Sequence, residues 1–218
     1  MAKKKNNYYN SSMYDEAIRS IRTNIQFSSV DKKNKVISIT SAKPAEGKST
    51  VIYNLAKSFA ENGDKVILLD CDLRKPSIST ISGVENNLGL TNFLTGKVYL
   101  ADAISTDDEQ ENLDLMLTGP IPPNPAEVLA SNAFKSLVEE LSSAYDYIFL
   151  DTPPVGLFTD ASLVSTLSDG VIFTIKSNDT KREDISVALD NLNKVNAHIL
   201  GTVLTHVPMK KKKYGNYY

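Results

Sequence analysis

The sequence predicts an α/β fold in which a mostly parallel central sheet carries helices on both faces. Apolar, β-branched runs of strand length alternate with runs of helical periodicity along the 218 residues, and this alternation is typical of parallel sheets. Three of the strand-like runs end in a glycine-containing loop or in a carboxylate, at the sheet edge where ligands bind. The expected strands are residues 35–40, 65–70, 113–117, 147–151, 170–175 and 199–205.

The first strand leads into a loop that is suited to bind phosphate. Residues 41–50 read SAKPAEGKST and precede a helical run at 51–60, which is the context of a P-loop. Backbone N–H groups of residues 46–50 would face an anion at a helix N-terminus. Lys48 adds a charge for the β- and γ-phosphates, and the Ser49 hydroxyl suits Mg²⁺. The expected cofactor-binding residues are Lys43, Pro44, Ala45, Glu46, Gly47, Lys48, Ser49 and Thr50.

The loop departs from the common pattern GxxxxGK[ST] at one position. Ala42 stands where the pattern has its first glycine, and a methyl group there restricts the turn without abolishing it. The alternative interpretation of residues 47–49 is a helix cap that binds no ligand.

Carboxylates at two further strand ends point to the same edge of the sheet. Asp70 and Asp72 close the second strand at a spacing that puts both on one side of an extended chain. Asp151 ends a strand that Pro153 and Pro154 cannot continue; alone, it could equally be a strand-end cap. The predicted catalytic residues are Lys48, Asp70, Asp72 and Asp151, and the predicted Mg²⁺ ligands are Ser49, Asp72 and Asp151.

The roles of these carboxylates stay open at this point. Asp72 is the candidate base for phosphoryl transfer or a metal partner. Asp70 would support the metal or orient the group that accepts the phosphate. Arg74 and Lys75 could steady transferred charge or recruit the acceptor.

Composition excludes several classes of protein. The length suits one α/β domain, and a net charge of −2 provides no basic field for nucleic acid. The lone cysteine excludes an intrachain disulfide and fits a reducing compartment. No apolar run approaches the roughly 20 residues of a membrane span, and no signal peptide follows the first lysines. We therefore expect a cytoplasmic protein unless a partner tethers it.

Capping patterns predict where two later helices begin. An apolar stripe favours one helix over residues 126–143, with Asn124 as its N-cap and Glu127 in a capping box. Thr180 and Glu183 form the pattern of a second capping box.

The ends of the chain are expected to differ from the domain at residues 13–207. Residues 1–12 are polar and predict a mobile arm. A helix at residues 13–30 then carries Ile18, Ile21 and Ile25 on one apolar stripe. Beside that stripe, at steps of three, stand Glu16, Arg19 and Arg22. Their simplest interpretation is a solvated face with weak pairs, worth a few tenths of a kcal/mol.

Three segments together resemble the Walker A, A′ and B motifs of bacterial tyrosine kinases, known as BY-kinases. They are residues 41–49 (SAKPAEGKS), 68–76 (LLDCDLRKP) and 148–154 (IFLDTPP). The resemblance covers nearly the whole chain, including residues 119–127 and the tyrosine-rich end at 214–218. It implies a P-loop NTPase fold, ATP and Mg²⁺ as cofactors, and a kinase that phosphorylates itself and regulates capsule or exopolysaccharide synthesis.

The resemblance also gives the C-terminal tail a function. Residues 208–218 are lysine-rich and too poor in apolar side chains to fold alone. Fully extended, they would span on the order of 35 Å, enough to reach a neighbour's active site. By resemblance the phosphoacceptors are Tyr214, Tyr217 and Tyr218; the alternative is a solubilising end whose tyrosines are incidental.

Partners follow from the same resemblance. Glu16, Arg19 and Arg22 match the family's self-association motif Glu-x-x-Arg-x-x-Arg, which implies a ring-like homo-oligomer. The resemblance further implies a separate transmembrane activator that recruits the chain to the inner face of the membrane. It also implies polysaccharide-synthesis enzymes as substrates and a cognate tyrosine phosphatase. No nucleic-acid partner is expected.

Two other uses of the same fold remain as alternatives. Lys43 stands five residues before Lys48, at the place of the signature lysine of Min/Par-type positioning ATPases. Those proteins carry Lys-Gly-Gly where this chain has Lys43-Pro44-Ala45, and a tyrosine tail has no purpose in that scheme. The third interpretation is a regulatory subunit that binds nucleotide without catalysis.

Overall fold

A seven-stranded sheet forms the centre of the molecule, in the order β3-β4-β2-β5-β1-β6-β7. The computed structural model describes residues 2–28 and 34–208, with side chains from residue 12 onward. All strand pairs are parallel except β3 with β4. The strands are β1 (Val36–Ser41), β2 (Val66–Asp70), β3 (Ser105–Asp107), β4 (Gln110–Met116), β5 (Tyr147–Asp151), β6 (Gly170–Lys176) and β7 (Ile199–Thr205). The six strands expected from the sequence are present, and β3 is an additional antiparallel edge strand.

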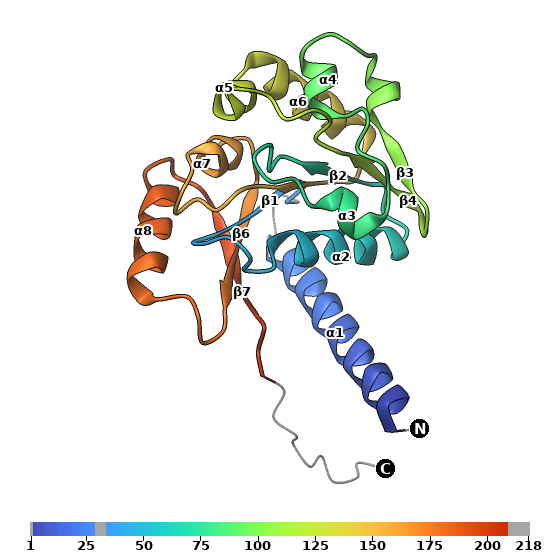
Figure 1. The fold of residues 1–218 in the computed structure, drawn as a ribbon, viewed down its shortest axis with the longest axis vertical. Helices are drawn as coiled ribbons and strands as arrows, with labels where there is room; N and C mark the ends of the chain where they lie inside the picture. Colours follow the sequence, from blue (N-terminus) through green and yellow to red (C-terminus); the bar gives the residue numbers. More distant parts are fainter. Residues whose placement is uncertain (1, 29–33, 209–218) are drawn as a thin grey trace.

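Helices cover both faces of this sheet (Figure 1). They are α1 (Ala2–Phe27), α2 (Lys48–Glu61), α3 (Ile78–Ser82), α4 (Leu90–Leu94), η1 (Leu100–Ala103), α5 (Pro125–Leu129), α6 (Asn132–Ala144), α7 (Asp160–Ser165) and α8 (Arg182–Asn193). On one face, α1, α2 and α3 bury apolar side chains against the central strands, with Phe59 of α2 packed on Tyr147 and Phe149 of β5. On the other face, α6 packs over β2 and β5, and α8 over β6. The fold is therefore the expected α/β arrangement.

Helix α1 begins much earlier than the sequence pattern indicated. It starts at Ala2 instead of after residue 12 and ends at Phe27. Residues 2–12 thus belong to α1, whereas the sequence pattern placed the start of the helix after Ser12. No proline or glycine occurs between residues 2 and 27 to end the helix. The predicted apolar stripe is confirmed, because Ile18 and Ile25 are buried in the core and Ile21 packs against it.

Two of the expected helix starts are also corrected. The run at 126–143 is divided into α5 and α6, because the Ser131 hydroxyl accepts the N–H of Phe134 at 3.2 Å and starts a second helix. Asn124 does occupy the N-cap position, as expected, but of the short helix α5, and its side chain donates to the Glu127 carboxylate at 3.1 Å and makes no capping hydrogen bond to the backbone. The capping box expected at Thr180 is likewise absent, since α8 begins after Lys181.

None of the helices in the described part of the chain combines the length and the apolar character needed to cross a membrane.

Candidate active site

The loop between β1 and α2 has the backbone shape of a phosphate-binding loop. Gly47 precedes α2 with φ of 83°, and Ala45 also takes a left-handed φ of 58°. Ala42, in contrast, does not take a positive φ, so the missing first glycine of the pattern creates no backbone strain. A Cβ on Gly156 would lie 2.3 Å from the Ala42 carbonyl oxygen. The loop after β5 therefore packs directly on the backbone of the phosphate loop.

The catalytic residues expected from the sequence come together at the carboxyl ends of β2 and β5. Asp70 and Asp151 are register partners in the sheet, and both are buried. Burial raises the pKa values of Asp72 and Asp151, and Lys48, also buried, lies close enough for its charge to oppose that rise. Three strand ends that are distant in sequence thus converge beside one loop, as the motifs predicted.

Asp151 has the surroundings of a cation ligand. It is 0% exposed, and neither carboxylate oxygen has a hydrogen-bond partner of normal geometry. Burial, and next the charge of Asp70, raise its pKa to about 8, while Lys48 and the Ser49 hydroxyl act in the opposite direction. A buried carboxylate without partners is costly unless a cation binds it.

The carboxylate of Asp70 instead accepts hydrogen bonds from the protein's own backbone. One of its oxygens accepts the N–H groups of Ser77 and Ile78, both at 3.1 Å, and the other accepts that of Asp72 at 3.2 Å. Burial raises the pKa of Asp70 to about 7, and the three N–H groups counteract that rise. Asp70 thereby fixes the loop that carries Asp72.

Asp72 is buried less completely than the other two aspartates, at 7% exposure. One of its oxygens accepts the N–H of Lys75 at 3.0 Å. Burial raises the pKa of Asp72, whereas that hydrogen bond and the Lys48 charge lower it. A carboxylate near a lysine and a phosphate loop can accept a proton or bind a metal ion.

The residues fit a magnesium ion that arrives with a nucleotide. Mg²⁺ prefers oxygen ligands and is commonly held by one or two carboxylates together with substrate phosphates. Ser49, Asp72 and Asp151 are the residues that would hold it here. Within the residues that the structure describes, no group of three or more His, Cys, Asp or Glu side chains could hold a metal ion alone, so phosphate oxygens would have to complete the coordination.

Arg74 is held in place by a residue that the sequence patterns did not single out. Its guanidinium makes two hydrogen bonds to Asp160, at 2.9 and 3.0 Å, and Asp160 is 0% exposed. The guanidinium also lies 4.3 Å from the ring centroid of Phe158. Arg74 therefore ties the loop after β2 to the start of α7. Asp160 gave no local signal, because a single acidic residue at a helix start is common.

Lys43 is turned toward α8. Its Nζ lies 2.5 Å from Asp184 in the first turn of that helix. The hydrogen bond to Asp184 raises the pKa of Lys43 and lowers that of Asp184. In this chain the lysine at the signature position thus has a partner within the same subunit.

The residues expected at the subunit interface are divided between two environments. Glu16 and Arg19 form an exposed pair at 3.4 Å. Arg22 donates to the backbone carbonyl of Ser58 on α2 and to the Ser58 hydroxyl. The tyrosines expected to be the phosphoacceptors, Tyr214, Tyr217 and Tyr218, lie outside the described residues.

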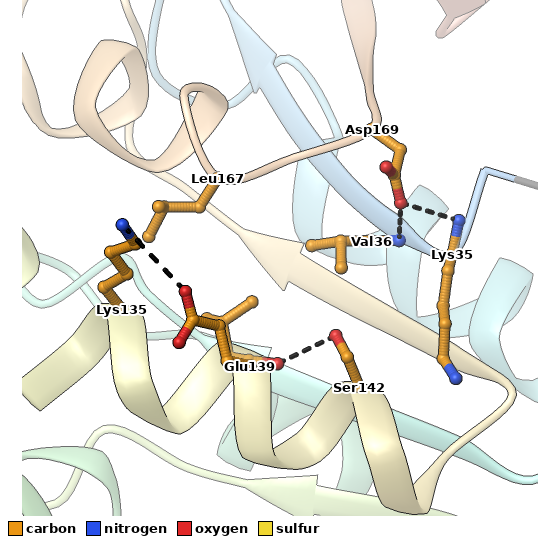
Figure 2. Close-up of a pocket in the computed structure, with 8 residues that line it drawn as sticks. Lys35, Val36, Lys135, Glu139, Ser142, Leu167 and Asp169 are labelled. Atoms are coloured by element: carbon orange, nitrogen blue, oxygen red, sulfur yellow. Dashed lines mark hydrogen bonds and ion pairs between the residues drawn. The ribbon is translucent and has the colours of Figure 1, made fainter.

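A surface hollow lies away from these residues. It has a volume of about 460 Å³ and is lined by Lys35, Val36, Lys135 and Glu139 among others (Figure 2). Asp169 accepts the N–H groups of Lys35 and Val36 at its rim, as Figure 2 shows. These residues mark the amino ends of β1 and β6, opposite to the phosphate loop. The hollow therefore does not belong to the nucleotide site.

Fold and site together define a P-loop nucleotide-binding protein, and residues 34–204 match the family model described as an AAA domain. The tyrosine-protein kinase YwqD of Bacillus subtilis is 42% identical over 95% of this chain and 87% of its own length. The chain belongs to the bacterial tyrosine-protein kinase family.

Solved structures agree with this assignment. The chimerical protein CapA2B2 superposes with a TM-score of 0.86 at 36% identity, over 89% of this chain and 85% of that one. The septum site-determining protein MinD of Pyrococcus horikoshii, solved with Mg-ADP, has a TM-score of 0.66 at 29% identity, over 78% of this chain and 69% of that one. CapA2B2 is thus the more similar of the two.

Proposed function

We propose that this chain is an ATP-dependent protein-tyrosine autokinase that phosphorylates the tyrosines of a neighbouring subunit's tail, Tyr214, Tyr217 and Tyr218. The observation that carries the proposal is the buried carboxylate of Asp151, whose oxygens accept no hydrogen bond of normal geometry although Lys48 and Ser49 lie beside it. A Mg-nucleotide supplies the cation that this carboxylate lacks. The relative YwqD is a tyrosine-protein kinase, which supports tyrosine as the acceptor.

Different residues of the site have different roles in the proposed phosphoryl transfer. Such transfer needs mainly positioning and neutralisation of charge. Lys48 and the N–H groups of residues 46–50 would hold the phosphates, and Ser49 and Asp151 would hold Mg²⁺, which would supply positive charge beside the transferred phosphate. A tyrosine with a pKa near 10 is only about 0.1% ionised at pH 7, so a proton acceptor helps. Asp72 suits that role, because burial raises its pKa and strengthens it as a base.

The cellular setting of the proposed kinase follows the family resemblance. We propose a ring-like homo-oligomer that acts from the cytoplasm and is recruited to the membrane by a separate transmembrane activator. CapA2B2 is a chimerical protein, which supports a functional association between two polypeptides. Capsule or exopolysaccharide synthesis is the proposed process, with its enzymes as further substrates and a tyrosine phosphatase as the opposing partner.

Mass spectrometry of the purified full chain with Mg-ATP tests the proposal. The incubation is done with and without the cytoplasmic segment of an activator, for wild type, Lys48→Met and a Tyr214/Tyr217/Tyr218→Phe variant. We expect phosphate on the tail of the wild type only. Lys57→Met, on the same helix but paired with Glu109 at the surface, and Tyr99→Phe, whose tyrosine is 83% exposed, are matched controls that should remain active.

A positioning ATPase is the second candidate function, because the MinD structure shares this fold. An unmodified tail together with steady release of free phosphate would favour it and contradict the kinase. The pairing of Lys43 with Asp184 supports the kinase instead, since it holds the signature lysine against its own subunit.

A further inference from the structure

Glu46 lies inside the phosphate loop but is directed away from the ligand side. Its side chain is almost fully buried, at 1% exposure. One carboxylate oxygen accepts the backbone N–H groups of Ala42, at 3.1 Å, and of Lys43, at 3.2 Å. The other accepts the hydroxyl of Thr180. The carboxylate is therefore fully occupied within the protein.

Two distant segments hold Glu46 in this position. Thr180 precedes α8, and its hydroxyl also accepts the N–H of Lys176 at 3.1 Å. Thr205, at the end of β7, donates to the carbonyl oxygen of Glu46 at 2.8 Å. The methyl group of Thr205 would lie 3.3 Å from a Cβ on Gly47. Both the side chain and the backbone of Glu46 are thus fixed by residues more than 130 positions further along the chain.

A buried carboxylate beside a phosphate site needs a physical reason. Its negative charge repels phosphate, and its burial is costly without strong hydrogen bonds. The N–H groups of Ala42 and Lys43 provide them, and without Glu46 these donors would lack an acceptor in the interior. Glu46 also stands between two residues with left-handed backbone, Ala45 and Gly47, a conformation that a non-glycine residue keeps only when its surroundings enforce it.

We propose that Glu46 is a positioning residue that holds the phosphate loop in its binding shape before nucleotide arrives, with Thr180 and Thr205 as its anchors. The carboxylate satisfies the inward N–H groups of Ala42 and Lys43, and this leaves the N–H groups of residues 46–50 free to face phosphate. The inference rests on the proposed binding of nucleotide at this loop.

Preorganisation of this kind is expressed mainly in the rate of association. When the loop is shaped in advance, binding needs no ordering step, whereas a loop that samples several shapes binds only in a fraction of encounters. Glu46→Ala should therefore reduce the association rate constant for nucleotide by about tenfold, with a smaller change in dissociation. Glu46→Gln should retain most of the rate, because its amide oxygen can accept both N–H groups and its amide nitrogen can donate to Thr180.

Stopped-flow binding of a fluorescent Mg-ADP analogue to the full chain tests this proposal. The variants are Glu46→Ala, Glu46→Gln and Thr180→Val, with Glu139→Ala on the exposed face of α6 as a control. Thr180→Val removes one anchor without altering the loop sequence, so it carries the test if Glu46→Ala fails to fold. We expect slower association for Glu46→Ala and Thr180→Val, and near wild-type rates for Glu46→Gln and Glu139→Ala.

The outcomes separate this inference from the proposed function. A wild-type chain that does not bind the analogue contradicts nucleotide binding at the loop and this inference with it. If the wild type binds and Glu46→Ala or Thr180→Val associates equally fast, only the role of Glu46 is overturned. Equal slowing in Glu46→Gln and Glu46→Ala would also overturn it, since the hydrogen-bond geometry would then not be the cause.

Discussion

Asp70 and Asp151 lie side by side at the ends of β2 and β5, yet their carboxylates have opposite surroundings. Asp70 accepts three backbone N–H groups, whereas both oxygens of Asp151 are buried without a hydrogen bond of normal geometry. The side chain of Asp70 therefore orders the loop after β2 without any ligand, whereas that of Asp151 depends on a cation. Substitution of the two aspartates should separate these roles.

Asp151→Asn should stabilise the ligand-free protein at alkaline pH. Burial raises the pKa of Asp151 from 3.8 to about 8, so the folded state binds more protons than the unfolded state within that window. The contribution of Asp151 to stability is therefore lost as the pH rises from about 4 to about 8. At pH 8.5 the asparagine avoids a buried charge, and we expect a gain of at least about 1 kcal/mol.

Melting curves at pH 5 and pH 8.5 without Mg²⁺ check this prediction. The melting temperature of the wild type should fall more between pH 5 and pH 8.5 than that of Asp151→Asn. With Mg-nucleotide at pH 8.5, the wild type should have the higher melting temperature of the two proteins, since only the wild-type carboxylate can bind the cation. Parallel pH profiles for the two proteins would contradict the assignment of Asp151.

Asp70→Asn should destabilise the protein instead. An asparagine amide cannot accept the N–H groups of Ser77, Ile78 and Asp72 together, and an unsatisfied buried donor costs about 1–3 kcal/mol. Urea unfolding of the ligand-free chain measures this loss. Asp108→Asn, in the exposed turn after β3, is the control and should change stability by less than about 0.5 kcal/mol. A variant as stable as the control would show that the three hydrogen bonds contribute little.

The strands that bear the site could be predicted because their signal is local. The expected run 147–151 coincides with β5, and 65–70 differs from β2 by one residue. Each is a continuous apolar run that ends in an aspartate, which is the pattern of a strand buried on both faces. The convergence of Asp70 and Asp151 followed from parallel topology alone.

The contacts that organise the site could not be predicted in this way. Asp160 is 86 positions from Arg74, and Thr180 is 134 positions from Glu46. No periodicity or spacing reports such pairs, because they depend on how the loops fold over the sheet edge. The break between α5 and α6 was missed for a similar reason: Ser131 is an ordinary polar residue within an apolar stripe until its hydroxyl is seen to cap Phe134.

Arg74→Met should destabilise the fold by leaving the Asp160 carboxylate buried without its two hydrogen bonds. We expect a loss of about 1–3 kcal/mol, at the lower end of values for broken buried pairs because Arg74 is partly exposed. A double-mutant cycle with Asp160→Asn, followed by denaturant unfolding, measures the coupling. The exposed pair of Lys135 and Glu139, 3.9 Å apart, is a matched control with an expected coupling below about 0.5 kcal/mol. Equal couplings for the two pairs would show that burial of Asp160 has no energetic effect.

Arg22 and Arg19 should respond differently to alanine, although both match the self-association motif. Arg22 donates to the carbonyl and hydroxyl oxygens of Ser58 on α2, so Arg22→Ala should reduce the stability of the single subunit by about 1–2 kcal/mol. Arg19 contacts only the exposed Glu16 among the interactions of its described side chain, so Arg19→Ala should leave stability within about 0.5 kcal/mol.

Sedimentation velocity and urea unfolding of both variants distinguish the two roles. Arg19→Ala should lower the sedimentation coefficient of the oligomer without shifting the unfolding midpoint, because a solvent-exposed guanidinium is free to pair with a neighbouring subunit. Arg22→Ala should shift the midpoint, and it should weaken assembly only through the loosened contact between α1 and α2. If Arg22→Ala unfolds like the wild type but no longer assembles, then Arg22 must leave Ser58 when subunits associate, and the motif would act as one unit across the interface.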